Sequence, residues 1–279
     1  MPELPEVETI TRALSLGGRG GPSIIGRRIV AAHLYWPRTL ALPDVVSFLD
    51  GIRDQQVVQI NRRAKYIVMT LSRSSLLIHL RMSGDLRVEV KQADLKNALL
   101  PHDRMSLVFE NDSAMIFNDT RKFGRVWLTA DPQKILGNLG PEPLSEELNA
   151  DRFYHMLQKR NRQLKPLLMD QNFLAGLGNI YTDEALFKAR LHPLTIAGRV
   201  NRDQAAVLLA AIREVLNEGI KRNGASIDWV YRGGDFQNTF NVYQRNGQVC
   251  YVCGAIIQRT VIGQRGSHFC PNCQRENND

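Results

Sequence analysis

The sequence predicts an α+β protein of more than one domain, and three observations support this prediction. Short runs of branched and aromatic residues separated by turns fill positions 24–129, a pattern typical of a β-sandwich or barrel. Helical periodicity dominates positions 151–221, and all four cysteines lie after position 249. At 279 residues the chain exceeds one typical domain, so we expect two domains and a small C-terminal appendage.

The first domain is predicted over residues 1–132. A helix begins near Pro5 and buries Val7, Ile10 and Leu14, and a short helix with Asp44 as its N-cap covers 45–49. The predicted strands cover 24–36, 57–61, 66–71, 75–80, 86–90, 105–110, 114–118 and 125–129.

The second domain is predicted over residues 133–225, followed by a loop region over 226–241 and a C-terminal segment over 242–279. Its expected helices cover 151–159, 166–169, 179–190 and 202–221. Asn201, with Gln204 three residues later, is a good N-cap for the last of these helices. The run from Gly176 to Asn179 fits either an anion-binding helix start or a tight turn that needs glycine.

The charge balance favours a polyanionic partner. The net charge is +8 and the isoelectric point is near 9.5. Carboxylates crowd the first eight residues, which argues against a signal peptide, and the longest apolar stretch is too short to span a bilayer. We therefore expect a cytoplasmic protein that does not bind membranes.

The cysteines form two C-x2-C pairs, and this spacing indicates a metal site. Their four thiolates would complete a tetrahedral zinc site, so the one expected cofactor is a structural zinc ion. Two disulfides are the alternative, but nothing in the sequence indicates an oxidising compartment. A redox motif would need a thioredoxin-like context, which the tail lacks. The predicted ligands are Cys250, Cys253, Cys270 and Cys273.

Pro2 offers a nucleophile once Met1 is removed. A terminal amine titrates near 8, so about a tenth of it is neutral at pH 7, far more than for an unperturbed lysine. A secondary amine that condenses with an aldehyde carbon gives an iminium, whose positive charge promotes elimination. Glu3 lies beside it as a proton donor. The simpler interpretation is that Pro5, Glu6 and Glu8 only start a helix.

Several separated motifs together resemble one family, the bacterial formamidopyrimidine-DNA glycosylases, which remove oxidised purines from DNA. The match covers nearly the whole chain and keeps the motifs in order. Its segments are Pro2–Thr9, Asn61–Tyr66, Ile78–Gly84, Asp119–Gly124, Lys165–Asp170 with Gly178–Tyr181, and Gln264–Arg265.

The resemblance implies a fold and a mechanism. The fold is an N-terminal helix with an antiparallel β-sandwich, a helix–two-turns–helix domain and a four-cysteine zinc finger. The implied catalytic residues are Pro2, Glu3, Lys65 and Arg265, which act through a Schiff base, base release and β,δ-elimination. Met82, Arg121 and Phe123 would fill the space left by a flipped nucleotide, with Arg121 on the opposite base. The other implied DNA contacts are His79, His102, Arg160, Lys165 and Asn179.

The implied partner is double-stranded DNA that carries oxidised purines or abasic sites, bound by a monomer in the bacterial cytoplasm at the nucleoid. Leu4 argues against the related endonuclease VIII group, which prefers oxidised pyrimidines and commonly has glycine there. A zinc-containing DNA-binding protein without enzymatic activity is the alternative from another class. The lesion-capping loop over 226–241 looks shorter than the commonly described form.

Overall fold

The structure, a computed structural model, describes residues 1–90, 99–227 and 233–276. It contains two compact units. The first comprises residues 1–137 together with 223–234, and the second comprises residues 138–222 together with 235–279. The chain thus returns to the first unit after the helices of the second, whereas the predicted domain ranges follow one another along the sequence. Those four ranges stay a prediction.

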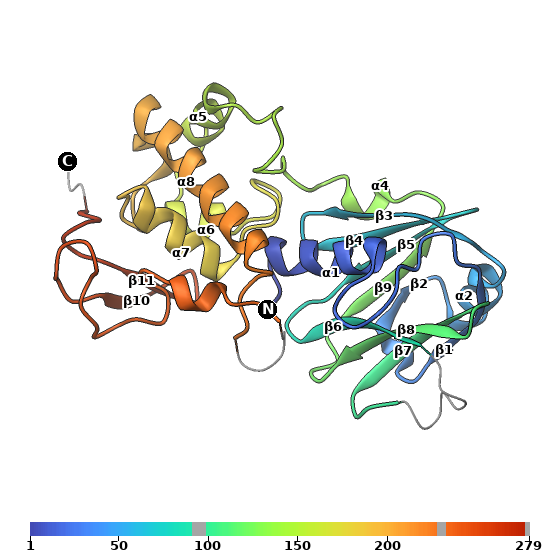
Figure 1. The fold of residues 1–279 in the computed structure, drawn as a ribbon. Coiled ribbons are helices and arrows are strands. Elements are labelled where there is room, and N and C mark those ends of the chain that lie inside the picture. The colour runs from blue at the N-terminus through green and yellow to red at the C-terminus, as the bar shows by residue number, and fades with distance from the viewer. Residues whose placement is uncertain (91–98, 228–232, 277–279) are drawn as a thin grey trace. The chain divides into compact units, whose positions relative to one another are not determined.

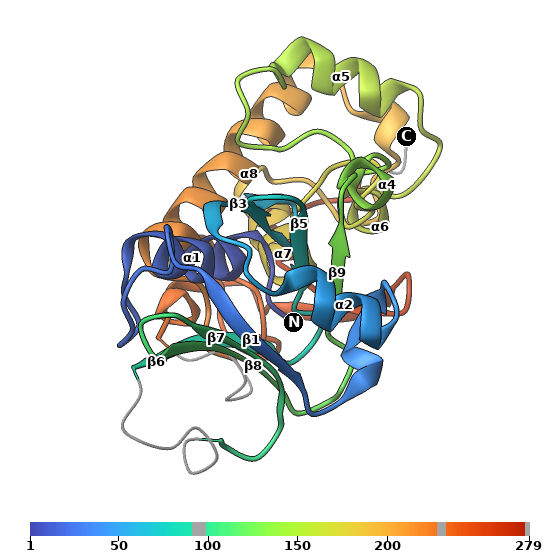
Figure 2. The same cartoon turned by 90° about the vertical axis from the view of Figure 1, so that its right-hand side faces the viewer.

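The first unit contains two sheets that lie face to face (Figures 1 and 2). The four-stranded sheet has the order β1 (Ile29–Leu34), β7 (Asp103–Phe109), β8 (Ser113–Asp119) and β6 (Gly84–Val90). The five-stranded sheet has the order β2 (Leu40–Leu42), β9 (Arg125–Thr129), β5 (Ser75–His79), β4 (Tyr66–Leu71) and β3 (Val57–Arg63). Apolar side chains from both sheets form one buried cluster between them. The predicted sandwich is therefore confirmed.

Helix α1 (Leu4–Leu16) completes this core. Its predicted apolar stripe of Val7, Ile10 and Leu14 is buried, and the helix contacts β3 and β4 of one sheet and β6 of the other. A helix that packs on both sheets is held along its length, so its first turn is fixed within the unit. The other helices here are α2 (Val45–Ile52), the 3-10 helix η1 (Pro37–Thr39) and α4 (Gln133–Leu136).

Most predicted strands agree with the structure, and the differences have local causes. The predicted strand over 24–36 shortens to β1 because Gly26 adopts a positive φ of 79° in a turn before it. The three-residue β2 is too short to show an alternating pattern, and it pairs parallel with β9. Asp44 does cap α2, accepting a hydrogen bond from the Ser47 amide at 3.0 Å.

The second unit is helical, with a small hairpin near its C-terminal end. Its helices are α5 (Ala150–Gln158), α6 (Leu164–Leu168), α7 (Asn179–Lys188), α8 (Arg202–Lys221) and the 3-10 turns η2 (Ala197–Arg199) and η3 (Phe236–Thr239). Asn201 and Gln204 form the predicted capping box of α8. Helix α7 ends two residues before its predicted limit, because Arg190 adopts a left-handed φ of 55°.

The hairpin of β10 (Gln258–Ile262) and β11 (Arg265–Phe269) was not predicted from the sequence. Its apolar cluster is small and borrows Phe187 from α7. In the described residues, no helix is long and apolar enough to cross a membrane.

Candidate functional site

The N-terminal residues are buried and held by reciprocal carboxylate contacts. Glu3 caps α1, and its amide donates to Glu6 Oε2 at 2.7 Å while its own side chain accepts from the first helical turn. Pro2, Glu3 and Glu6 are all buried. The sequence motif therefore starts a helix, as the simpler interpretation holds, and it also fixes the candidate nucleophile in space.

Glu6 also holds the segment that returns to the first unit. Its Oε1 accepts from the Ala225 amide at 2.8 Å. Gly224 precedes that amide with φ of 82°, and a Cβ there would lie 2.6 Å from Glu6 Oε1, so this approach requires glycine. One buried carboxylate thus binds both the Glu3 amide and the amide of Ala225, which directly precedes the predicted lesion-capping region.

The base of that region is closed by one hydroxyl. Ser226 Oγ donates to the Gly234 carbonyl at 2.7 Å and accepts from the Gly234 amide at 3.0 Å. Residues 228–232 of the predicted loop lie outside the described residues. The described ends of the loop are therefore joined directly to each other.

Lys65 lies in the tight turn between β3 and β4 and is buried. Ala64 takes a positive φ of 52° in this turn, and its carbonyl accepts from Arg62 Nη1 at 3.0 Å. Arg62 also pairs with Glu8 of α1 at 2.9 Å. Through these contacts the turn that carries Lys65 is anchored to the helix that begins at the candidate nucleophile.

His79, at the end of β5, is a buried neutral imidazole. Burial, with the positive charges of Arg81 and Lys65, lowers the pKa of His79 from 6.5 to about 3. Its Nδ1 accepts from the Arg81 amide at 2.9 Å, so the proton of the neutral ring is assigned to Nε2. An Nε2–H group is a donor suited to a phosphate oxygen.

The three residues predicted to fill a vacated stack lie on two loops of the first unit. Phe123 is half exposed, and the Arg121 guanidinium stands 5.2 Å from the centre of its ring. Met82 is partly buried. His102 is exposed, and its Nδ1 lies 3.2 Å from Arg104 Nη2. Exposed apolar and cationic side chains on short loops are what insertion between bases requires.

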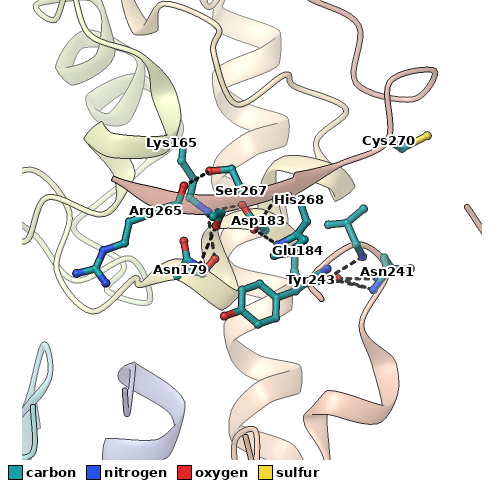
Figure 3. A network of polar contacts seen from close by, with 12 residues as sticks. Lys165, Asn179, Asp183, Glu184, Asn241, Tyr243, Arg265, Ser267, His268 and Cys270 are labelled. Atoms are coloured by element: carbon teal, nitrogen blue, oxygen red, sulfur yellow. Dashed lines mark hydrogen bonds and ion pairs between the residues drawn. The ribbon is translucent and has the colours of Figure 1, made fainter. Parts of the chain in front are cut away.

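In the second unit, Asn179 begins α7 and contacts the hairpin. Its Nδ2 donates to the Gly266 carbonyl at 3.1 Å, and Figure 3 shows the two elements side by side. Gly178, the N-cap, has no side chain and so supplies no side-chain cap of its own. Such a helix start favours an anion.

The resemblance implies a phosphate contact for Lys165, which lies in α6 next to α7. Its ammonium is fully buried and forms an ion pair with Asp183 Oδ1 in α7 (Figure 3). Asp183 Oδ2 accepts from the His268 amide at 2.9 Å and lies 3.2 Å from its Nδ1. Lys165 Nζ also lies 3.4 Å from the Asn179 carbonyl. In this structure Lys165 therefore supports Asn179 and the hairpin, and its phosphate contact stays a prediction.

Arg265 is exposed and directly follows the hairpin turn. Gly263 and Gln264 have φ of 55° and 64°, which is the two-residue geometry that matches the twist of paired strands. Figure 3 shows the Arg265 side chain extending away from the buried Asp183 group. Arg160, just after α5, is exposed as well. Both arginines are available to phosphates.

The four cysteine sulfurs lie within 4.8 Å of one another. The Sγ atoms of Cys250 and Cys273 are 3.9 Å apart, and those of Cys253 and Cys270 are 3.4 Å apart. Disulfides need about 2.05 Å, whereas tetrahedral zinc with bonds of about 2.3 Å places its sulfurs about 3.8 Å apart. The donor set therefore fits a closed structural zinc site.

Sequence reasoning missed the carboxylates that position these groups. Asp183 and Glu184 lie inside a helix whose residues 180–187 are all buried, and Glu184 accepts from the amides of Asn241, Val242 and Tyr243. Two adjacent acids followed by Ala-Leu-Phe were the available signal, since buried carboxylates need partners. Asp119 was noticed only as the first residue of a motif.

Three family models match the chain. They are the formamidopyrimidine-DNA glycosylase N-terminal domain over residues 1–126, the formamidopyrimidine-DNA glycosylase H2TH domain over 139–230, and a zinc finger found in FPG and IleRS over 247–275. With the sulfur geometry, the last match identifies one structural zinc ion as the cofactor.

Whole-chain relatives agree with these models. The formamidopyrimidine-DNA glycosylase of Protochlamydia amoebophila is 39% identical over 99% of this chain and 100% of its own. The Lactococcus lactis Fpg, solved with DNA containing N7-benzyl-Fapy-dG, is 34% identical with a TM-score of 0.88, over 99% of this chain and 100% of that one. The same enzyme, solved with DNA containing an abasic site, is 33% identical with a TM-score of 0.88, over 99% of this chain and 100% of that one. The chain therefore belongs to the formamidopyrimidine-DNA glycosylase family.

Proposed function

We propose that this chain excises oxidised purines from double-stranded DNA and then cleaves the resulting abasic site. Family membership over the full length makes it a base-excision repair glycosylase. The observation that carries the mechanism is the N-terminus, where Pro2 and Glu3 are buried and the Glu3 amide is held by Glu6. A fixed terminal amine is positioned for attack on a sugar carbon, because orientation lowers the entropic barrier.

The proposed reaction begins at the sugar. The Pro2 nitrogen, with Met1 removed, attacks C1′, and the bond from C1′ to the base breaks while Glu3 assists opening of the sugar ring. Lys65 assists release of the base. The base leaves with its bonding electron pair and a proton, and the ring-opened sugar is bound to Pro2 as an iminium.

Elimination follows from the charge of that iminium. Loss of the C2′ proton breaks the bond from C3′ to the 3′ phosphate, and a second elimination, for which Arg265 is proposed, breaks the bond to the 5′ phosphate. The zinc site is filled by four protein thiolates, so the metal would stabilise the folded finger and take no part in the reaction. His79, His102, Arg160 and Asn179 are proposed to hold phosphates, and Lys165 to act through Asn179.

Flipping precedes this chemistry. Extruding a paired base costs a few kcal/mol. Met82 and Phe123 are proposed to replace part of the lost stacking, while Arg121 hydrogen-bonds the opposite base, for which cytosine is the expected partner. The preferred lesions are 8-oxoguanine and formamidopyrimidines, and the setting is the bacterial cytoplasm at the nucleoid, with the enzyme acting as a monomer.

Borohydride trapping tests the proposal. The chain is incubated with duplexes that carry 8-oxoguanine or an oxidised pyrimidine, each opposite its matched base, and the reduced adduct is mapped by peptide mass. We expect an adduct at Pro2, faster with the purine lesion, and no adduct on a form that keeps Met1. An adduct on Lys65 would overturn the mechanism. Faster release of the pyrimidine would assign the endonuclease VIII preference, and absence of any excision would leave only DNA binding.

A further inference from the structure

The two loops that carry Met82, Arg121 and Phe123 are neighbouring connections between the same two sheets. One loop runs from β5 to β6, and the other runs from β8 to β9. Strand β5 pairs with β9 in one sheet, and β6 pairs with β8 in the other, with Gly84 opposite Asp119. The two loops therefore leave the sandwich side by side.

One buried carboxylate joins these loops. Asp119 is fully buried, and its Oδ1 accepts from the Ser83 hydroxyl of the first loop. The Arg121 amide of the second loop donates to Ser83 Oγ at 3.0 Å and lies 3.2 Å from Asp119 Oδ1. Asp119 Oδ2 accepts from the Gly124 amide at 2.7 Å. Both oxygens of the Asp119 carboxylate thus accept hydrogen bonds from residues of the two loops.

The backbone of Asp119 extends the connection to a fourth predicted DNA contact, His102. Its amide donates to the His102 carbonyl at 2.9 Å, and its carbonyl accepts from Arg104 Nε at 2.7 Å. Residues proposed to fill the stack and a residue proposed to hold phosphate therefore share one anchor.

Close packing beneath the loops leaves no room for them to slide. A Cβ on Gly84 would lie 2.8 Å from the buried Phe117 ring and 2.5 Å from the Leu80 carbonyl. A Cβ on Gly124 would lie 2.3 Å from the same ring. Both loops rest on one side chain at distances that only glycine permits, since real Cβ atoms do not approach this closely.

We propose that Ser83 and Asp119 are positioning residues that make the two loops one rigid wedge, so that Met82, Arg121 and Phe123 enter the duplex together. The proposal rests on the proposed function. In this proposal the stacking by Met82 and Phe123 and the contact of Arg121 with the opposite base form together, in one insertion step. A wedge set before binding avoids the entropy of ordering two separate loops in the complex.

Ser83→Ala tests the link, and Ser113→Ala is its matched control. Ser113 is an equally buried serine at the other end of β8, where its hydroxyl donates to Asn111 Oδ1 at 2.8 Å. Loss of a hydrogen bond to a charged group should slow single-turnover excision of a paired lesion by about tenfold or more. Cleavage of an abasic site should slow by less than about threefold, because no base is unstacked there. Discrimination between opposite bases should weaken, and Ser113→Ala should change none of these.

A double-mutant comparison separates a link from a general loss of stability. In the parent chain, Met82→Ala and Phe123→Ala should be non-additive on paired lesions, because one wedge carries both. In the Ser83→Ala background their effects should become additive. Equal slowing on both substrates, or unchanged non-additivity, would overturn the wedge. If the parent chain excises no paired lesion, the proposed function fails and the wedge fails with it, whereas normal excision by the parent with unchanged non-additivity rejects the wedge alone.

Discussion

The two units position their candidate DNA contacts by different physical means. In the first unit a large apolar core fixes the strands, and the predicted contacts stand on short loops at strand ends. In the second unit the hairpin has only a small apolar cluster, and α7 holds it through the buried carboxylate of Asp183, while Glu184 holds the segment at Val242 that precedes the hairpin. Apolar burial tolerates the loss of an exposed side chain, whereas a buried charge needs each of its partners.

Substitutions are therefore expected to damage the fold in the second unit and only the reaction in the first. Substitution of exposed loop residues in the first unit should change the reaction rates and leave the stability of the fold intact. Loss of the metal or of the buried ion pair in the second unit should change the structure of the hairpin and thereby weaken DNA binding.

The largest effect is expected from removal of the metal. Structural zinc contributes about 10–16 kcal/mol of apparent binding free energy in small fingers, far more than this small cluster can supply. Cys270→Ser should therefore lose zinc, unfold residues 242–276 and weaken DNA binding. Metal analysis, hydrogen exchange and titration with abasic-site DNA measure the three results, and the exchange of strands β3–β9 should not change. Full zinc content with parent affinity would contradict the assignment.

Next in size is Asp183→Asn, which leaves the Lys165 ammonium buried without its counter-ion. Breaking a buried pair from one side costs about 3–5 kcal/mol. Asp151→Asn is the matched control, because Asp151 pairs with Arg202 in an exposed ion pair of the same unit, and exposed pairs contribute about 0–1 kcal/mol. Denaturation curves measure the stability of the two variants, and hydrogen exchange of the β10 and β11 amides measures the local stability of the hairpin in each. Equal destabilisation by both would show that the buried pair does not hold the hairpin.

A smaller effect, confined to the reaction, is expected for Phe123→Ala. Stacking of an aromatic side chain on a base is worth about 1–3 kcal/mol, so excision of a paired lesion should slow by about ten- to a hundredfold. Strand cleavage at an abasic site should fall much less. Since Phe123 is 50% exposed, thermal stability should stay near that of the parent. Equal slowing on both substrates would mean that the residue supports the catalytic pocket.

The smallest effect is a pH dependence of the first unit through His79. Its native pKa of about 3 lies below the unfolded value of 6.5, so in this window the unfolded chain binds a proton that the native chain does not. The contribution of His79 to the free energy of unfolding is therefore fully present above about pH 6.5 and is lost as the pH falls. The free energy of unfolding should decrease by about 2 kcal/mol between pH 7 and pH 5. His79→Gln, which keeps an acceptor for the Arg81 amide, should flatten this slope. An unchanged slope in urea unfolding of the variant would reject the role of His79.

The local elements, the metal site and the family could be predicted from the sequence alone. Periodicity placed α8 and strands β4 and β9 to the residue, since strong local patterns and caps act over a few positions. The C-x2-C spacing predicted the metal site, because two short knuckles bring their own ligands together. The N-terminal motif gave the family, which the whole-chain relatives confirm.

The burial of particular polar residues, and the partners that they hold, could not be predicted without the three-dimensional fold. The resemblance implies a phosphate contact for Lys165, yet its ammonium pairs with Asp183, eighteen positions away. Glu6 looked like a helix-start acid, yet it reaches Ala225 across 219 positions. Asp119 gained its role from Ser83 and Gly124. A carboxylate carries no mark of its partner in the sequence, because its free energy in the fold depends on desolvation and on donors that distant segments supply.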